Sequence, residues 1–257
     1  MLRLQDRLFE SAVRRRCLPL LALAPLAGRA EPAARLRMAY FDRYPPLSNL
    51  GDTGQMHGLL IDLVNAVGAR AGLRFEHHGY PWARAQAMVE RGELDGLCTN
   101  ATPARKAYAL FCDTPLVVTS MGLFFRRKDS RPRHLNSVPE MRALRQGSYR
   151  GSGFAQQHLE PEHIVFDHDA ESVLRRIALG DLDIYVADDL VTRSQIRRLK
   201  LSQQLDYRPL GFLPPSRYRW GLRLSYPDAG ALVRRMEAAT QQAQQAGALR
   251  AILKRYE

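Results

Sequence analysis

The most constraining feature of the sequence is an alternation of short apolar runs with stretches of helical period in its N-terminal half. Apolar runs at residues 36–41, 73–78 and 94–98 predict strands. Between them, the stretches 59–71 and 82–89 repeat apolar residues with the period of a helix. Strands that alternate with helices favour an α/β fold with a parallel sheet.

A second unit of the same kind follows the first. A strand near residues 143–145 is predicted to meet the glycine-rich turn 147–153, and a helix is predicted from about Phe154. The helical residues 227–256, broken near Gly247, return to complete the first unit. We therefore expect two lobes joined by two hinge crossings, with a cleft between the lobes as a natural ligand site. The expected ranges are 31–121 with 222–257 for lobe 1, 127–216 for lobe 2, and 122–126 and 217–221 for the crossings.

The first 30 residues differ from the rest of the chain. Three arginines at positions 14–16 precede an apolar run at 17–27, and small residues follow it up to Ala30. A basic segment, a short apolar core and small residues before a cleavage point are typical of a secretory signal peptide. The run is too short to span a bilayer. We therefore expect residues 1–30 to be a signal peptide and the protein to be periplasmic.

The charge of the chain narrows the choice of partners. The formal net charge is +12, and the first 30 residues hold six arginines against Asp6 and Glu10, which leaves +8 for the remainder. A basic surface can indicate nucleic-acid binding. The arginines are spread along the chain, however, without a dense run interleaved with aromatic residues. We expect an anionic ligand or surface instead, and no nucleic-acid partner.

Two cysteines remain beyond the leader, Cys98 and Cys112, on two predicted strands. In an oxidising compartment they either form a disulfide or stay as buried free thiols. The sequence has no CxxC motif, no HExxH motif and no Cys/His cluster. It therefore predicts no metal site and no cofactor.

The stretch 92–116 holds the first group of candidate site residues. It reads as a buried strand, a polar turn and a helix that starts at Thr102 and Pro103. The amide of Asn100, the hydroxyl of Thr102 and the guanidinium of Arg105 then lie at the carboxyl end of a strand, where ligands bind in open α/β sheets. These donors suit a carboxylate. The alternative is an ordinary turn with an exposed arginine.

Four further residues are candidates, each with a structural alternative. Tyr44 lies on a proline-stiffened loop and Trp82 at a helix start, and each either forms a wall of a pocket or covers the core. Asp188 either caps the helix that follows it or faces a cationic group of a ligand. The small-residue turn around Ser148 either exposes amides that hold an anion or is a flexible loop.

Several short motifs in a set order together resemble one family. The chain is similar to the extracytoplasmic solute-binding proteins of amino-acid ABC transporters, known as solute-binding family 3, with the type II periplasmic binding fold. The similarity covers nearly all residues beyond the leader. It lies in Tyr44-Pro-Pro-Leu, Gly58-Leu-Leu-Ile-Asp62-Leu, Trp82 with Gly92-Glu-Leu-Asp95-Gly, Thr102-Pro-Ala-Arg105, Phe111-Cys-Asp-Thr-Pro115-Leu, Arg145-Gln-Gly147-Ser148, and Gly180-Asp-Leu-Asp183 followed by Asp188.

The resemblance implies a role for each polar candidate. Arg105 would clamp the α-carboxylate of a ligand in a bidentate pair, helped by Asn100 and by the backbone around Ser148. Asp188 would receive the α-ammonium group. A guanidinium–carboxylate pair in a closed and dry cleft is strong because it is charge-assisted.

The resemblance also places the ligand side chain between Tyr44 and Trp82. The chain departs from the family pattern in three ways. Asn100 stands where a threonine is usual, and Leu47 stands where an aromatic residue is common. The segment between Asp95 and Arg105 is also about two residues shorter than in typical amino-acid binders. These departures bear on the donor geometry, and therefore on whether the ligand is a standard amino acid.

The function expected from these features is that of a periplasmic solute-binding protein rather than an enzyme. It would capture an amino acid or related carboxylate and deliver it to a membrane ABC permease, as a monomer. One alternative is an enzyme on the same fold, such as a cyclohexadienyl-type dehydratase, with Glu171, His57 or His158 as acid or base. Another is a ligand-sensing partner of a membrane receptor.

Overall fold

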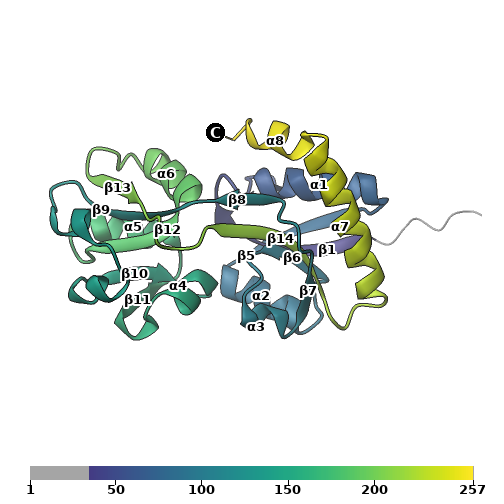
Figure 1. The fold of residues 1–257 in the computed structure, drawn as a ribbon, viewed down its shortest axis with the longest axis horizontal. Helices are drawn as coiled ribbons and strands as arrows, with labels where there is room; N and C mark the ends of the chain where they lie inside the picture. The colour runs from purple at the N-terminus through teal and green to yellow at the C-terminus, as the bar shows by residue number, and fades with distance from the viewer. Residues whose placement is uncertain (1–34, 257) are drawn as a thin grey trace, which may run out of the picture. The chain divides into compact units, whose positions relative to one another are not determined.

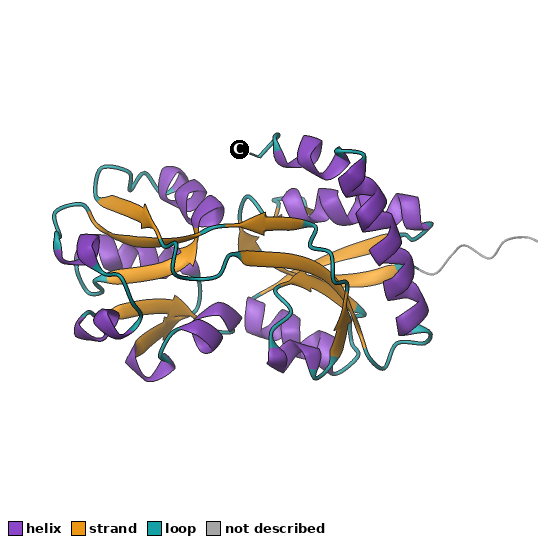
Figure 2. Cartoon of the chain, in the orientation of Figure 1, coloured by secondary structure: helices purple, strands orange, loops and turns teal. Residues whose placement is uncertain are grey.

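The computed structural model describes residues 35–256. The predicted signal peptide, residues 1–30, lies outside the described residues. No helix within 35–256 is long and apolar enough to cross a membrane. The described chain forms two β-sheets covered by helices, with a small three-stranded sheet beside the first (Figures 1 and 2).

The first sheet confirms the predicted α/β fold. Its strands lie in the order β5-β1-β6-β14-β7, and β8 pairs with β14 off this path. β1 is parallel to both neighbours, whereas β14 is antiparallel to β6 and β7 because it returns from the second lobe. The bounds are β1 (Leu36–Phe41), β5 (Phe75–Tyr80), β6 (Gly96–Thr99), β7 (Ala109–Phe111), β8 (Val117–Thr119) and β14 (Ser216–Arg223).

Helices cover both faces of this sheet. α1 (Leu59–Ala71) links β1 to β5, and α2 (Trp82–Glu90) links β5 to β6 in the opposite direction across the sheet. Because parallel crossovers are right-handed, opposite directions place the two helices on opposite faces, as Figure 1 shows. α7 (Ala229–Gln245) and α8 (Ala248–Leu253) pack beside α1. Gly247, with φ 69°, separates these last two helices, as the sequence predicts.

The second sheet repeats this design with the order β11-β10-β12-β9-β13. β10 is parallel to β11 and β12, and β9 is antiparallel to β12 and β13. Its elements are β9 (Met121–Arg126), β10 (Gln146–Tyr149), β11 (Ile164–Asp167), β12 (Ile184–Asp188), β13 (Leu205–Pro209), α4 (Gly153–His158), α5 (Ala170–Leu179), α6 (Asp189–Arg198) and the 3₁₀ turns η1 (Arg131–His134), η2 (Pro139–Ala143) and η3 (Pro161–His163). The small sheet beside the first consists of β2 (Arg43–Tyr44), β3 (Ser48–Leu50) and β4 (Met56–His57).

One strand differs from the prediction. The strand expected near residues 143–145 is β10, at 146–149, so Gly147 and Ser148 are strand residues rather than parts of a turn. The reason is packing. A Cβ at Gly147 would lie 2.7 Å from a methyl carbon of Val173 and 2.6 Å from one of Leu182, so glycine lets the strand approach its neighbours closely.

The chain passes between the two sheets twice, once from β8 to β9 and once from β13 to β14. Only Ser120 separates β8 from β9, and residues 210–215 separate β13 from β14. Residues 122–126, expected as a crossing, are paired with both neighbours inside the second sheet. Residues 217–221, the other expected crossing, lie in β14 and are paired with β6, β7 and β8 of the first sheet. A change of sheet within an extended stretch leaves the apolar pattern unbroken, so the pattern does not mark where the change occurs.

Both lobes contain the same ion pair at the start of a strand. In the first lobe, the Asp95 carboxylate accepts bonds from the backbone N–H and the guanidinium of Arg37, while Asp95 N–H donates to the Arg37 carbonyl. In the second lobe, Asp183 and Arg145 make the same set of contacts. The two acids are the last residues of the related motifs Gly-Glu-Leu-Asp and Gly-Asp-Leu-Asp, so the lobes share one local design.

The apolar pattern of the strands follows from burial on two faces. In β9, Leu123 and Phe125 pack in one core cluster, and Phe124 packs in another on the opposite face. A strand buried on both faces reads as a continuous apolar run. Cys98 and Cys112 are both buried free thiols.

Candidate functional site

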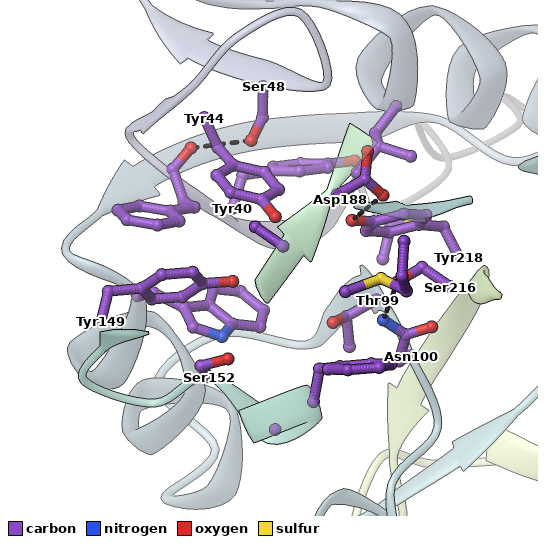
Figure 3. Close-up of a pocket in the computed structure, with 18 of the residues that line it drawn as sticks. Tyr40, Tyr44, Ser48, Thr99, Asn100, Tyr149, Ser152, Asp188, Ser216 and Tyr218 are labelled. Atoms are coloured by element: carbon purple, nitrogen blue, oxygen red, sulfur yellow. Dashed lines mark hydrogen bonds between the residues drawn. The ribbon is translucent and has the colours of Figure 1, made fainter. Parts of the chain in front are cut away.

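A cavity of about 50 Å³ lies where residues of both lobes meet (Figure 3). Four of the residues that line it are the last residues of parallel strands: Phe41 of β1, Thr99 of β6, Tyr149 of β10 and Asp188 of β12. Ligands of open α/β sheets bind at this carboxyl edge. The rest of the lining is mostly aromatic or polar and includes Tyr40, Tyr44, Ser48, Trp82, Asn100, Arg105, Ser152, Tyr185, Ser216 and Tyr218.

Arg105 lies on the short helix α3 (Pro103–Lys106), directly after β6. Only 4% of the surface of Arg105 is exposed. The guanidinium donates to Gln86 Oε1 (2.8 Å), to Thr99 Oγ1 (3.1 Å) and to the carbonyl of Asn100 (3.0 Å). A fourth bond, of 3.2 Å, reaches the carbonyl of Gly151 in the second lobe. Arg105 is therefore a buried residue that contacts both lobes, and the exposed arginine of the alternative interpretation is wrong.

The charge of Arg105 has no ionic partner. Its guanidinium carbon lies 5.1 Å from the ring centre of Trp82, a cation–π contact. Within residues 35–256, no carboxylate lies at ion-pair distance from it. Burial lowers the pKa of this guanidinium, because removing the charge from water disfavours the charged form. Neutral acceptors alone hold a buried positive charge at the cavity.

Asp188 presents a buried carboxylate to the same cavity. It ends β12 and caps α6, accepting a bond from the N–H of Val191 (3.2 Å). The hydroxyls of Tyr218 (3.2 Å) and Thr119 donate to its other oxygen. Burial raises the pKa of Asp188 to about 6, against the effect of these hydrogen bonds. Asp188 is thus both a cap and a cavity residue, and no basic group of the described chain pairs with it.

Aromatic rings form one end of the cavity. The ring of Phe41 stacks on Tyr44, with centres 5.3 Å apart, and on Trp82, with centres 6.4 Å apart. Tyr149 of the second lobe packs against Phe41 (5.5 Å) and Tyr44 (5.9 Å). Tyr44 and Trp82 therefore line the cavity. Both of them contact Phe41, which the sequence analysis does not name as a candidate.

The remaining predicted site residues lie in three different places. Asn100 lines the cavity, and its side chain also bonds to Ser216 Oγ and to the N–H of Arg217. Thr102 caps α3, as its position before Pro103 predicts, and lines a neighbouring open pocket rather than the cavity. Ser148 is buried in β10, does not line the cavity, and its hydroxyl has no partner among the described residues.

Several residues of the cavity are absent from the sequence-based prediction. Phe41, Thr99 and Tyr149 are not among its candidates, although each ends a parallel strand. The final residue of a predicted parallel strand is a signal that would have found Phe41, but the strands predicted at 94–98 and 143–145 end before Thr99 and Tyr149. Tyr218 carries no such signal, because β14 is antiparallel to β6 and lines the cavity with residues at its start, Ser216 and Tyr218.

The acid–base candidates for an enzyme do not meet at the cavity. Glu171 lies at the start of α5 and pairs with Arg198. His57 lies on β4 and His158 at the end of α4, beside the neighbouring pocket. None of the three is among the residues that line the cavity.

Comparison with known proteins agrees with this architecture. A family model described as bacterial extracellular solute-binding proteins, family 3, matches residues 36–257. No curated protein sequence matches the chain.

Several solved structures share the fold at low sequence identity. One is a histidine kinase sensor domain with similarity to periplasmic binding proteins, at a TM-score of 0.74 and 18% identity over 87% of this chain and 96% of that one. Another is an ancestral arginine-binding protein bound to arginine, at 0.72 and 16% over 86% and 97%. A third is the periplasmic VFT2 domain of BvgS from Bordetella pertussis, at 0.71 and 16% over 86% and 93%. At these identities the likeness shows the two-lobed binding-protein fold.

Proposed function

The chain belongs to family 3 of the bacterial extracellular solute-binding proteins, and on that basis we propose that it binds a small zwitterion, an amino acid or a close relative, in the cavity between its lobes. The bound solute is then delivered to a membrane ABC permease from the periplasm.

The observation that supports this proposal most is a pair of opposite, buried and unpaired charges on one cavity. Arg105 comes from the first lobe and Asp188 from the second. A buried charge without an ionic partner is unfavourable, because it loses hydration that neutral groups replace only in part. A ligand with a carboxylate at one end and an ammonium group at the other offers a partner to both. A simple anion or a simple cation offers a partner to one of them only.

The contacts at the cavity suggest how binding favours the closed arrangement. Arg105 donates to the carbonyl of Gly151, and Tyr218 donates to Asp188, so each polar group already bonds to the opposite lobe. A ligand carboxylate at Arg105 replaces the neutral carbonyl by a charged acceptor, which makes the hydrogen bonds stronger. Because the two charges sit on different lobes, only the closed state presents both to one ligand, and the ligand therefore biases the equilibrium toward closure.

Replacing Arg105 tests the proposal directly. We expect Arg105→Ala to lose the thermal stabilisation that saturating glycine or alanine gives to the wild-type protein, since a ligand that binds only the folded state raises its melting temperature. Lys106→Ala is the matched control, because Lys106 is the next residue on the same helix and is exposed. Equal ligand-induced shifts in Arg105→Ala and Lys106→Ala would show that Arg105 holds no ligand.

Delivery to a permease is the expectation for the family, and a sensing role is the second candidate because a histidine kinase sensor domain shares the fold. Uptake of a labelled solute by cells separates the two. Deletion of the protein lowers uptake if it serves a permease. It leaves uptake unchanged and abolishes a transcriptional response if it serves a receptor.

A further inference from the structure

We infer that Phe41 occupies the place of the ligand side chain and restricts the site to zwitterions with a hydrogen, a methyl group or a similarly small substituent. This inference rests on the proposed function and names the class of solute within it. It also makes Phe41 a residue that determines specificity without contacting either charged end of the ligand.

The ring of Phe41 is in direct contact with the rings of Tyr44 and Trp82. Phe41 stacks on Tyr44 at an interplanar angle of 15° and on Trp82 at 24°, with centres 5.3 Å and 6.4 Å apart. Both distances fall within the range of direct aromatic contact, about 4.5–7 Å. No planar group of a ligand fits between Phe41 and either partner. The two aromatic surfaces that the sequence assigns to a ligand side chain are therefore covered by the protein itself.

Phe41 is also held in place by its neighbours. It is the last residue of β1 and is 6% exposed. The hydroxyl of Ser48 donates to its carbonyl (2.8 Å), and the N–H of the next residue, Asp42, donates to the carbonyl of Tyr80 (3.1 Å). Tyr149 covers the ring from the second lobe. A strand end fixed on both sides, under a packed ring, does not swing aside at low free-energy cost to admit a large side chain.

The space that remains in the cavity is small. The cavity measures about 50 Å³. Since one water needs about 10–15 Å³ of such volume, the space holds roughly three to five water-sized groups. Glycine, with five non-hydrogen atoms, lies at the top of this range, and alanine, with six, lies one atom above it. With Arg105 and Asp188 at the charged groups, little volume is left for anything beyond a methyl group.

Calorimetric titration of the full chain with glycine, alanine and phenylalanine tests the inference. The wild-type protein is expected to bind glycine or alanine at least about tenfold more tightly than phenylalanine, the discrimination that a well-packed apolar site reaches for bulk. Phe41→Ala is expected to reduce that ratio at least about tenfold by gaining affinity for phenylalanine. Phe75→Ala is the control, because Phe75 packs on His77 and Trp220 and does not line the cavity.

Phe41→Leu covers the case in which Phe41→Ala does not fold, because leucine keeps apolar volume while removing the ring. It is expected to shift the ratio in the same direction by a smaller factor. The inference is overturned if wild-type protein binds phenylalanine as tightly as glycine, or if the folded Phe41 variants keep the wild-type ratio. In either case amino-acid binding itself, and with it the proposed function, still stands. If no zwitterion binds to the wild-type protein, both the proposed function and this inference are wrong.

Discussion

At the scale of single residues, Asp188 shows how a buried carboxylate can weaken the free protein. Its pKa rises from an ordinary 3.8 to about 6 because the carboxyl is buried. The native state therefore binds more protons than the unfolded state between about pH 4 and pH 6, and stability falls as the pH rises through this window. At neutral pH the ionised carboxylate is buried without a cation, which favours a ligand that brings one.

Asp188→Asn is therefore expected to stabilise the ligand-free protein at pH 7, on the order of 1–3 kcal/mol from the pKa difference. Asparagine still caps α6 through its side-chain oxygen, and the hydroxyls of Thr119 and Tyr218 can rotate to accept from its amide. Thermal melting at pH 7 and pH 4 measures the effect, which should be much smaller at pH 4. A lower melting temperature for the variant at pH 7 would contradict this account of the buried charge.

The affinity for a zwitterion should also depend on pH through Asp188. The ammonium group of the ligand favours the ionised carboxylate, so binding expels a proton below about pH 6 and affinity falls as the pH drops through this value. Titrations at pH 5.5 in two buffers of different ionisation enthalpy measure the released protons. A released-proton count of zero, with affinity constant from pH 5 to pH 7, would show that Asp188 does not face the ligand.

The sequence predicts the charged ends of the site better than its walls. Arg105 and Asp188 stand in motifs, because a charge needs a particular local backbone to hold it. Phe41 and Tyr149 carry no motif, since any strand end can present a ring and only the three-dimensional arrangement shows which rings meet. Ser148 is a candidate only as part of a predicted anion-binding turn, and its place in β10 directs it away from the cavity.

At the scale of elements, the repeated aspartate–arginine pair joins the starts of two neighbouring parallel strands, β1 and β6 in the first lobe and β10 and β12 in the second. Burial alone would raise the pKa of Asp183, but the side chain and N–H of Arg145 donate to it and lower the pKa to about 2. The native state then binds fewer protons than the unfolded state, so this contribution is fully present above about pH 4 and is lost as the pH falls toward 2.

We expect Asp183→Asn to lower the melting temperature at pH 7 and to lose part of the acid sensitivity between pH 4 and pH 2. The groups of Arg145 and Arg131 that donate to Asp183 would then face a neutral acceptor. Acid unfolding followed by circular dichroism is the measurement, with Asp181→Asn, an exposed neighbour, as the control. Identical unfolding curves for the two variants would show that the ion pair of Asp183 does not stabilise the protein.

Gly147 gives a second test at the element scale. A Cβ at this position would lie within 2.7 Å of both Val173 and Leu182, so Gly147→Ala overpacks the contact between β10 and α5. The expected loss is about 1–3 kcal/mol in denaturant unfolding. Gly211→Ala is the control, because a methyl group added there would have nothing within 4 Å, and its change should stay within about 0.5 kcal/mol. An equal effect at both positions would contradict the packing explanation for glycine in this strand.

At the scale of the whole molecule, we propose that the hinge lies where the strands change sheets, at Ser120 and residues 210–215. The sequence predicts two lobes and two passages, because each lobe repeats a recognisable pattern of strands and helices. It does not predict the residues of the passages, because extended chain looks the same in either sheet. Two polar contacts that join the lobes at the cavity converge on one carbonyl: Arg105 and Gln86 (3.3 Å) both donate to Gly151.

Removing one of these donors should shift the free protein toward an open state. Gln86→Ala is expected to increase the radius of gyration measured by small-angle X-ray scattering without ligand, and saturating ligand should restore the wild-type value. Gln55→Ala, which changes an exposed glutamine of the same lobe, should leave the scattering unchanged. If the ligand-free variant is as compact as the ligand-free wild-type protein, the hydrogen bonds to Gly151 do not hold the lobes together.

If Arg105 and Asp188 hold the two ends of one ligand, the most direct measurement removes those ends from the ligand instead of from the protein. Propionate is alanine without its ammonium group, and ethylamine is alanine without its carboxylate. Calorimetry should show that alanine binds at least about 30-fold more tightly than either analogue, because each leaves one buried charge unpaired. Propionate or ethylamine binding as tightly as alanine would contradict the account.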